Sequence, residues 1–152
     1  MTDVNLRQQV QEDMKAAMKA HDAKRLGAIR LLLAAIKQRE IDERIVLDDA
    51  QVLAVIDKMI KQRQDSAEQF QNAGRMDLVD QEKFEISILS AYLPPALSEQ
   101  EIAEYIQKAI QYLGATSMKD MGKVMAELKP QLQGRADISL VSAKIKELLG
   151  KA

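Results

Sequence analysis

Between residues 118 and 137, basic side chains stand beside glycines in a pattern suited to binding an anion. Lys119 and Lys123 are four residues apart, so they share one face if this stretch is helical. Arg135 follows Gly134 just before the expected last helix, whose free backbone amides favour a negative charge. Because ammonium and guanidinium groups pair strongly with phosphate oxygens, these residue types predict the binding of phosphate groups.

The two glycines of this segment have different expected roles. Gly122 falls at the edge of an apolar helical stripe, where a glycine costs about 1 kcal/mol relative to alanine. The usual compensation is close approach of a second backbone, from another helix or a ligand phosphate. Gly134 is expected to adopt a positive φ in the turn that follows Pro130. Lys144, in the last helix, is expected to join the other basic residues on one surface.

The charge balance supports a local basic patch and no more than that. Residues 115–152 hold seven Lys or Arg and four Asp or Glu, whereas the whole chain has a net charge of −1. Global electrostatics therefore gives no general attraction to nucleic acid or acidic membranes. The alternative interpretation is that these lysines only solvate a small domain, and that the methionines of the segment pack in its core.

Residues capable of catalysis or metal binding are few. His21 is the only histidine and stands beside Asp22 in a short turn, where a helix C-terminus favours such a side chain. With one histidine and no cysteine, a zinc site would need three carboxylates. We therefore predict no catalytic residue, no metal and no cofactor.

Two groups of carboxylates remain as candidates for acid–base chemistry. Asp48 and Asp49 form one group, and Asp77, Asp80 and Glu82 form the other. Both stand at expected helix starts, where acidic side chains favour the helix dipole without any catalytic role. The sequence contains no self-contained active site, so whether the protein is an enzyme stays open.

Apolar residues recur at intervals of three and four along nearly the whole chain, which predicts an all-α fold. Aromatic residues make up only 3% of the chain, so the core must consist mainly of aliphatic side chains. Leu31 and Leu32 widen the stripe of the second helix, which indicates packing on more than one side. Helices are expected over about 3–20, 49–73, 76–93, 99–113, 118–129 and 138–149, and the second helix is expected after the break "HDAKR", with Leu26, Ile29, Leu33 and Ile36 on its apolar face.

The clearest boundary along the chain is the pair Pro94-Pro95, because neither residue can donate a backbone hydrogen bond. Ser98 and Glu101 then match a capping box that starts the next helix. We expect two domains that fold independently: a long-helix hairpin or bundle at 1–95 and a small three-helix bundle at 96–152.

Several long motifs in order resemble the GatB/YqeY family, and in particular its stand-alone YqeY-like proteins. They are "RLGAIRLLLAAIKQREID", "QDSAEQFQNAGRMDL", "AYLPPALSEQEI", "DMGKVMAELKPQLQGRAD" and "LVSAKIKELL". The resemblance extends over nearly the whole chain. The C-terminal half is similar to the tail domain of the B subunit of tRNA-dependent amidotransferases, a small helical domain that contacts tRNA.

The resemblance implies roles for particular residues of the tail. Gly122 and Gly134 keep the twelve-residue glycine spacing of the tail, and Lys123 and Arg135 fall beside these glycines. Ile138 stands where the stand-alone family commonly has glycine. The catalytic domain of the amidotransferases has no counterpart in these 152 residues.

The leading hypothesis is a non-catalytic accessory protein that binds tRNA, or a tRNA-bearing complex, through its C-terminal domain. By resemblance it would be linked to glutamine-dependent amidation, a carbon–nitrogen ligase activity, with a protein of the aminoacyl-tRNA or amidotransferase machinery as partner. The alternative is a protein-interaction adaptor whose N-terminal helices dock a partner helix. Because no signal peptide or transmembrane run is present, we expect a cytoplasmic protein that does not associate with a membrane.

Overall fold

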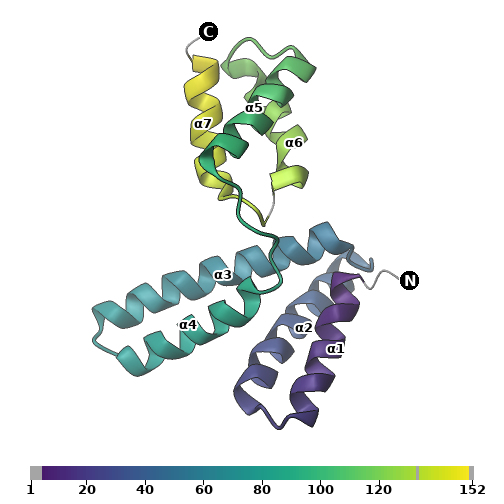
Figure 1. Ribbon diagram of the computed structural model, residues 1–152, viewed down its shortest axis with the longest axis vertical. Coiled ribbons are helices and arrows are strands. Elements are labelled where there is room, and N and C mark those ends of the chain that lie inside the picture. Colours follow the sequence, from purple (N-terminus) through teal and green to yellow (C-terminus); the bar gives the residue numbers. More distant parts are fainter. Residues whose placement is uncertain (1–4, 133, 151–152) are drawn as a thin grey trace. The chain divides into compact units, whose positions relative to one another are not determined.

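The computed structural model describes residues 5–132 and 134–150. This part of the chain forms seven α-helices and one short 3₁₀ helix, with no β-strand (Figure 1), so the all-α prediction is confirmed. The helices are α1 (Leu6–Lys19), α2 (Ala23–Glu43), α3 (Asp49–Asn72), α4 (Met76–Ser90), α5 (Glu99–Leu113), η1 (Met118–Asp120), α6 (Met121–Leu132) and α7 (Ile138–Gly150).

The chain divides into two compact units, Met1–Leu93 and Pro94–Ala152. The division falls at the Pro94-Pro95 pair. Each unit has its own hydrophobic core, with no residue shared between the two. Whether the two halves fold independently stays a prediction.

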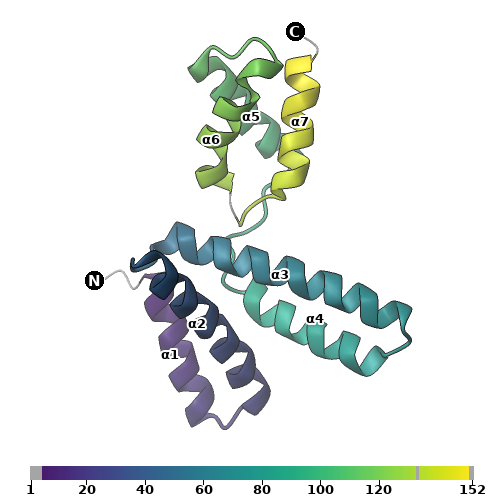
Figure 2. The ribbon, with the colours of Figure 1, turned by 180° about the vertical axis from the view of Figure 1, so that it is seen from behind.

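The N-terminal unit consists of two helical hairpins, α1–α2 and α3–α4, which diverge from each other in both views (Figures 1 and 2). Helix α2 contacts α1, α3 and α4. Its buried residues are Ala28, Ile29, Leu32 and Ile36, and they recur at three- and four-residue intervals on the side that the other helices cover. These residues lie on one side of α2 and Leu31 is 46% exposed, so the expectation that this helix packs on more than one side is wrong at Leu31.

In the C-terminal unit, α5, α6 and α7 surround a core of aliphatic side chains. Local capping signals define these helices. Ser98 accepts a hydrogen bond from the Glu101 amide at the start of α5, and Asp137 accepts one from the Ser139 amide at the start of α7. Gly114 ends α5 in a left-handed conformation with φ of 64°.

The expectation that the sixth helix would end or tighten before Pro130 is wrong, because α6 continues to Leu132. Pro130 is exposed and lies in the last turn of α6. A proline there removes one backbone donor near the helix end, and its ring points to solvent. The burial of Leu128 and Leu132 on the same face favours keeping this turn helical.

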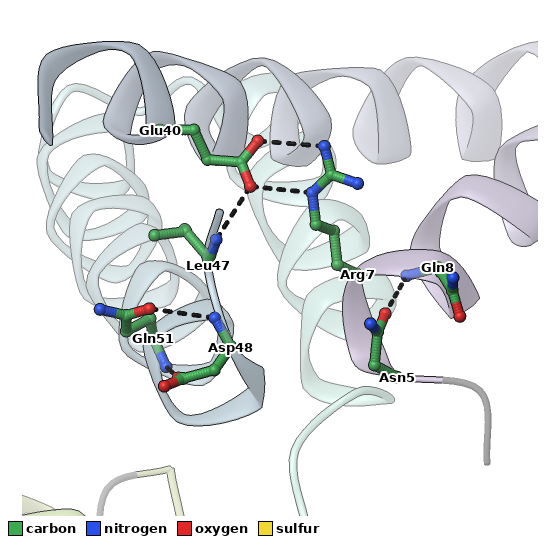
Figure 3. Close-up of polar contacts among 7 residues, drawn as sticks. All are labelled: Asn5, Arg7, Gln8, Glu40, Leu47, Asp48 and Gln51. Atoms are coloured by element: carbon green, nitrogen blue, oxygen red, sulfur yellow. Dashed lines mark hydrogen bonds and ion pairs between the residues drawn. The ribbon is translucent and has the colours of Figure 1, made fainter. Parts of the chain in front are cut away.

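A carboxylate fixes the corner between α2 and α3 (Figure 3). Glu40 accepts hydrogen bonds from Arg7 Nε at 2.8 Å, from Arg7 Nη2 at 3.1 Å and from the Leu47 amide at 2.9 Å. These bonds, the one with Arg7 first, lower the pKa of Glu40. Directly after Leu47, Asp48 and Gln51 form a reciprocal capping box that starts α3.

A second tie joins the end of the unit to its beginning. The hydroxyl of Tyr92 donates a hydrogen bond to Asp13 at 2.6 Å, and burial together with this bond raises the pKa of Tyr92. The chain leaving α4 is thereby attached to α1, next to the boundary at Pro94.

The Glu40 contacts lead to a pH-dependent prediction. Glu40→Gln should lower the free energy of unfolding by about 1–2 kcal/mol at pH 7, because it removes the charge from hydrogen bonds to Arg7 and Leu47. The folded pKa is depressed, so this stabilisation is complete above about pH 5 and is lost as the pH falls through the folded pKa.

Urea unfolding of both proteins between neutral and acidic pH measures this difference. Glu43→Gln is the matched control, since Glu43 pairs with Arg39 but is 46% exposed, and it should change stability by less than about 0.5 kcal/mol. A difference in stability between wild type and Glu40→Gln that does not shrink as the pH falls below the ordinary titration range of glutamate would contradict this account.

Candidate functional site

The structure does not bring the predicted basic residues together on one surface. Lys119 lies in η1 and Lys123 in the first turn of α6, and both are exposed. Arg135 follows the other end of α6. At 1.5 Å per residue, the twelve residues of α6 separate these positions by about 18 Å.

Arg135 is also held by its own unit. Its carbonyl accepts the Leu97 amide at 2.9 Å, and its Nη1 lies 3.4 Å from the Tyr105 hydroxyl. Its Nε is buried, without a hydrogen-bond partner in the part of the chain that the structure describes. The Arg135 guanidinium is therefore only partly exposed to solvent, because one side of it lies against Tyr105 of α5.

The remaining basic candidates differ in their surroundings. Lys144 is half-buried on α7, whereas Lys123 lies near Asp120. The amides of Thr116 and Ser117, and to a lesser extent the charge of Lys123, lower the pKa of Asp120. The positive charge of Lys123 is thus partly balanced. Phosphate binding by Lys119, Lys123, Arg135 and Lys144 stays a prediction.

The predictions for Gly122 and Gly134 have opposite outcomes. Gly134 has a φ of 80°, so its expected positive-φ turn is confirmed. The prediction that another helix closely approaches Gly122 is wrong. A Cβ built at Gly122 meets no atom within 4 Å among the described residues, and Gly122 is exposed in the first turn of α6. The sequence pattern placed Gly122 beside the apolar stripe, but that face of α6 is not covered there. Contact of either glycine with a ligand phosphate stays a prediction.

The candidate acid–base residues occupy structural positions. His21 is exposed, with a φ of 54°, in the turn between α1 and α2. Asp48 caps α3, and Asp49 accepts the Leu6 amide at 2.8 Å. Within residues 5–132 and 134–150, no group of three or more His, Cys, Asp and Glu is placed to hold a metal ion.

The second carboxylate group lies on α4. Asp77 pairs with Arg75 at 3.0 Å, which lowers the pKa of Asp77. Glu82 and Glu85 share the guanidinium of Arg63, at 3.5 and 3.1 Å. Since one cation faces two half-buried carboxylates, this cluster keeps a net negative charge.

Residues of this acidic cluster line a groove between α2 and α4 that the sequence analysis did not predict. Its volume is about 770 Å³. The α2 face of the groove is formed by Ala23, Lys24, Gly27, Ala28 and Leu31, and the α4 face by Asp77, Asp80, Gln81, Phe84 and Glu85. Both sets follow the three- and four-residue spacing of a single helix face.

The groove has an apolar interior and a largely acidic edge. Leu31 is 46% exposed and Phe84 is 37% exposed, although both are large apolar side chains. Gly27 lies inside α2, and a Cβ added to it meets no atom within 4 Å. Asp80 is exposed and forms no ion pair with a described residue. The groove can therefore receive an apolar ligand that carries positive charge.

The signal that could have identified this groove is the repetition of the same spacing on two helices. The run at Leu31–Leu33 has more apolar residues than one buried face requires. Gly27, a poor helix former, stands inside the expected second helix on the same face as Leu31. Only the three-dimensional structure shows that the α4 face with Phe84 lies opposite.

The fold and its surfaces define an all-helical protein of two compact units, with a groove in the N-terminal one and no metal cluster among the described residues. A family model described as YqeY-like protein matches residues 7–149. The chain belongs to the YqeY-like family.

Relatives of known name support this assignment. "Altered inheritance of mitochondria protein 41, mitochondrial" from Pyrenophora tritici-repentis is 33% identical over 93% of this chain and 79% of its own length. The protein of the same name from Lachancea thermotolerans is 35% identical, over 90% and 76% of the two chains. The one from Candida glabrata is 32% identical, over 93% and 68%.

These names correct one expectation from the sequence. The relatives are named as mitochondrial proteins, which contradicts the expected cytoplasmic localisation. That expectation depended on missing targeting signals, and a missing signal carries little information about a compartment. Across the described helices, none has the length and apolar character needed to span a membrane.

The open space at Gly27 gives a stability prediction. Gly27→Ala should raise the free energy of unfolding by about 0.5–1 kcal/mol, because it improves helix propensity inside α2 and meets no neighbouring atom. Thermal and urea unfolding measure the change.

Gly114→Ala is the matched control for this glycine substitution. Gly114 has a φ of 64°, so alanine there is strained and should lower stability by about 1 kcal/mol. A loss of stability in Gly27→Ala would mean that the groove is closed in solution.

Proposed function

We propose that this chain is a non-catalytic adaptor whose N-terminal unit binds an amphipathic helix of a partner protein in the groove between α2 and α4. The observation that carries this proposal is Gly27, which lies inside a helix, beside exposed Leu31, and faces open space. The protein's own packing gives no compensation for this glycine. A second backbone approaching α2 at this point would give one.

The shape and the side chains of the groove suit a helix. Ala23, Gly27 and Ala28 are small, so the axis of a bound helix could lie close to α2. Leu31 and Phe84 would then be covered by apolar residues spaced three and four apart on the partner. In this arrangement the bound helix packs against both α2 and α4, which line the groove.

The charges of the groove specify the polar flanks of that helix. Three carboxylates and one lysine line the groove, and one exposed carboxylate, Asp80, has no ion pair in the described chain. Lys or Arg at the edges of the partner helix would complement them. Helices flanked by Asp or Glu would be disfavoured because like charges would face each other.

Site-specific crosslinking tests the proposal, because the chain has no native cysteine. A photo-crosslinker attached to Lys24→Cys at the groove edge should react with one helical segment that has apolar residues at i, i+3 and i+4 and basic flanks. Leu140→Cys, at a position on α7 that is 68% exposed, is the control and should not give this product. Identical products from both sites would refute the proposal.

A second variant then tests the groove itself. Gly27→Gln places a longer side chain in the groove without meeting a neighbouring atom at Cβ. It should weaken binding of a synthetic copy of the crosslinked segment by at least about tenfold, with no loss of thermal stability. Unchanged affinity would show that the segment binds elsewhere.

Weak tRNA binding by the C-terminal unit is the second candidate function, and the link to glutamine-dependent amidation depends on it alone. The observation that favours it is the pair Lys119 and Lys123, both exposed near the start of α6. Arg135 lies at the other end of α6 and faces Tyr105, so we expect two phosphate contacts rather than three.

With two phosphate contacts, the logarithm of tRNA affinity should fall against the logarithm of salt with a slope of about −1.5 to −2. Titration of labelled tRNA at three salt concentrations measures this slope. Lys119→Glu/Lys123→Glu should abolish binding, and Lys15→Glu/Lys37→Glu, the same change of net charge in the N-terminal unit, should not. Equal binding by both double variants would exclude this site.

A further inference from the structure

A second groove lies on the other side of α2, between α2 and α1, and its chemistry is the reverse of the first. Its volume is about 670 Å³. Ile41, Ile45 and Val46 line it at its open end and are 61%, 39% and 75% exposed. They form the densest group of exposed large apolar side chains in the described chain. Scattered exposed apolar residues are ordinary, but a cluster in a groove indicates a binding surface.

The edges of this groove are basic. Lys15 from α1 and Lys37 from α2 are exposed, and neither forms an ion pair with a described residue. The other two charged residues lining the groove, Arg7 and Glu40, neutralise each other through their ion pair. The groove therefore has an apolar interior with two free positive charges beside it.

From this arrangement we propose that the groove between α1 and α2 binds a short acidic amphipathic helix of a partner protein. Arg7 and Lys15 span about 12 Å of α1, which corresponds to two to three helical turns of an occupant. Apolar residues of the occupant cover Ile41, Ile45 and Val46. Asp or Glu on its flanks pair with Lys15 and Lys37.

This surface is separate from the groove of the proposed function. Its lining residues come from the opposite side of α2 and from α1, with no residue in common. The two grooves also have opposite charge: acidic between α2 and α4, basic between α1 and α2. The chain can therefore hold two helices of different character, and failure of one site leaves the other unaffected.

Selection from a displayed peptide library tests the proposal on the full chain. The library fixes apolar residues at i, i+3, i+4 and i+7 and randomises the flanking positions among acidic, basic and neutral residues. Peptides that also bind Ile41→Ser/Val46→Ser are removed; both positions are largely exposed, so this variant should fold. The remaining peptides should carry Asp or Glu at the flanks.

An enriched peptide, labelled and titrated, then gives the affinity. Lys15→Glu/Lys37→Glu should weaken its binding about tenfold or more, and raised salt should weaken it as well. Gly27→Gln, Lys119→Glu/Lys123→Glu and Leu140→Ser should leave the affinity unchanged, which separates this site from the first groove and from general effects of charge.

Several results would overturn the proposal. They are enrichment of basic or uncharged flanks, no enrichment after depletion, and equal affinity of wild type and Ile41→Ser/Val46→Ser. Two other occupants would also overturn it: a second copy of this chain, seen as a dimer that Val46→Ser dissociates, or an anionic phospholipid vesicle bound by wild type in place of any peptide.

Discussion

The N-terminal unit depends on the burial of α2 against three other helices. Ile29, Leu32 and Ile36 are almost fully buried, and together with α1, α3 and α4 they form one continuous core. The two hairpins diverge from each other, and the side of α2 that carries Leu31 is only partly covered by α4. Ile41, on another face of α2, is exposed in the groove beside α1. The first groove thus follows from the divergence of the hairpins, whereas the second lies within the α1–α2 hairpin and the segment that follows it.

The sequence predicts the local features of this fold well. Caps and turns depend on residues within a few positions of each other, so the cap at Ser98 and the positive φ of Gly134 could both be assigned in advance. Their chemistry is that of single backbone groups and one nearby side chain. The all-α class follows from the same periodicity.

Features that depend on distant contacts could not be predicted. Gly122 and Gly27 are both helical glycines, and nothing in the sequence distinguishes one that faces solvent from one that faces a groove. Lys119, Lys123 and Arg135 are close in the chain, but the length of α6 separates Arg135 from the two lysines. The grooves are formed by regular helices whose composition is ordinary, so no local sequence signal marks them.

The Glu40 contacts at the corner after α2 also affect how a ligand would be bound. The bond from the Leu47 amide to Glu40 fixes the short segment that carries Ile45 and Val46, and the Asp48 cap fixes the residue after it. One wall of the groove between α1 and α2 is therefore preorganised, although it consists of loop residues. A ligand that binds there loses little conformational entropy in ordering this wall, so most of the free energy of apolar burial remains available for affinity.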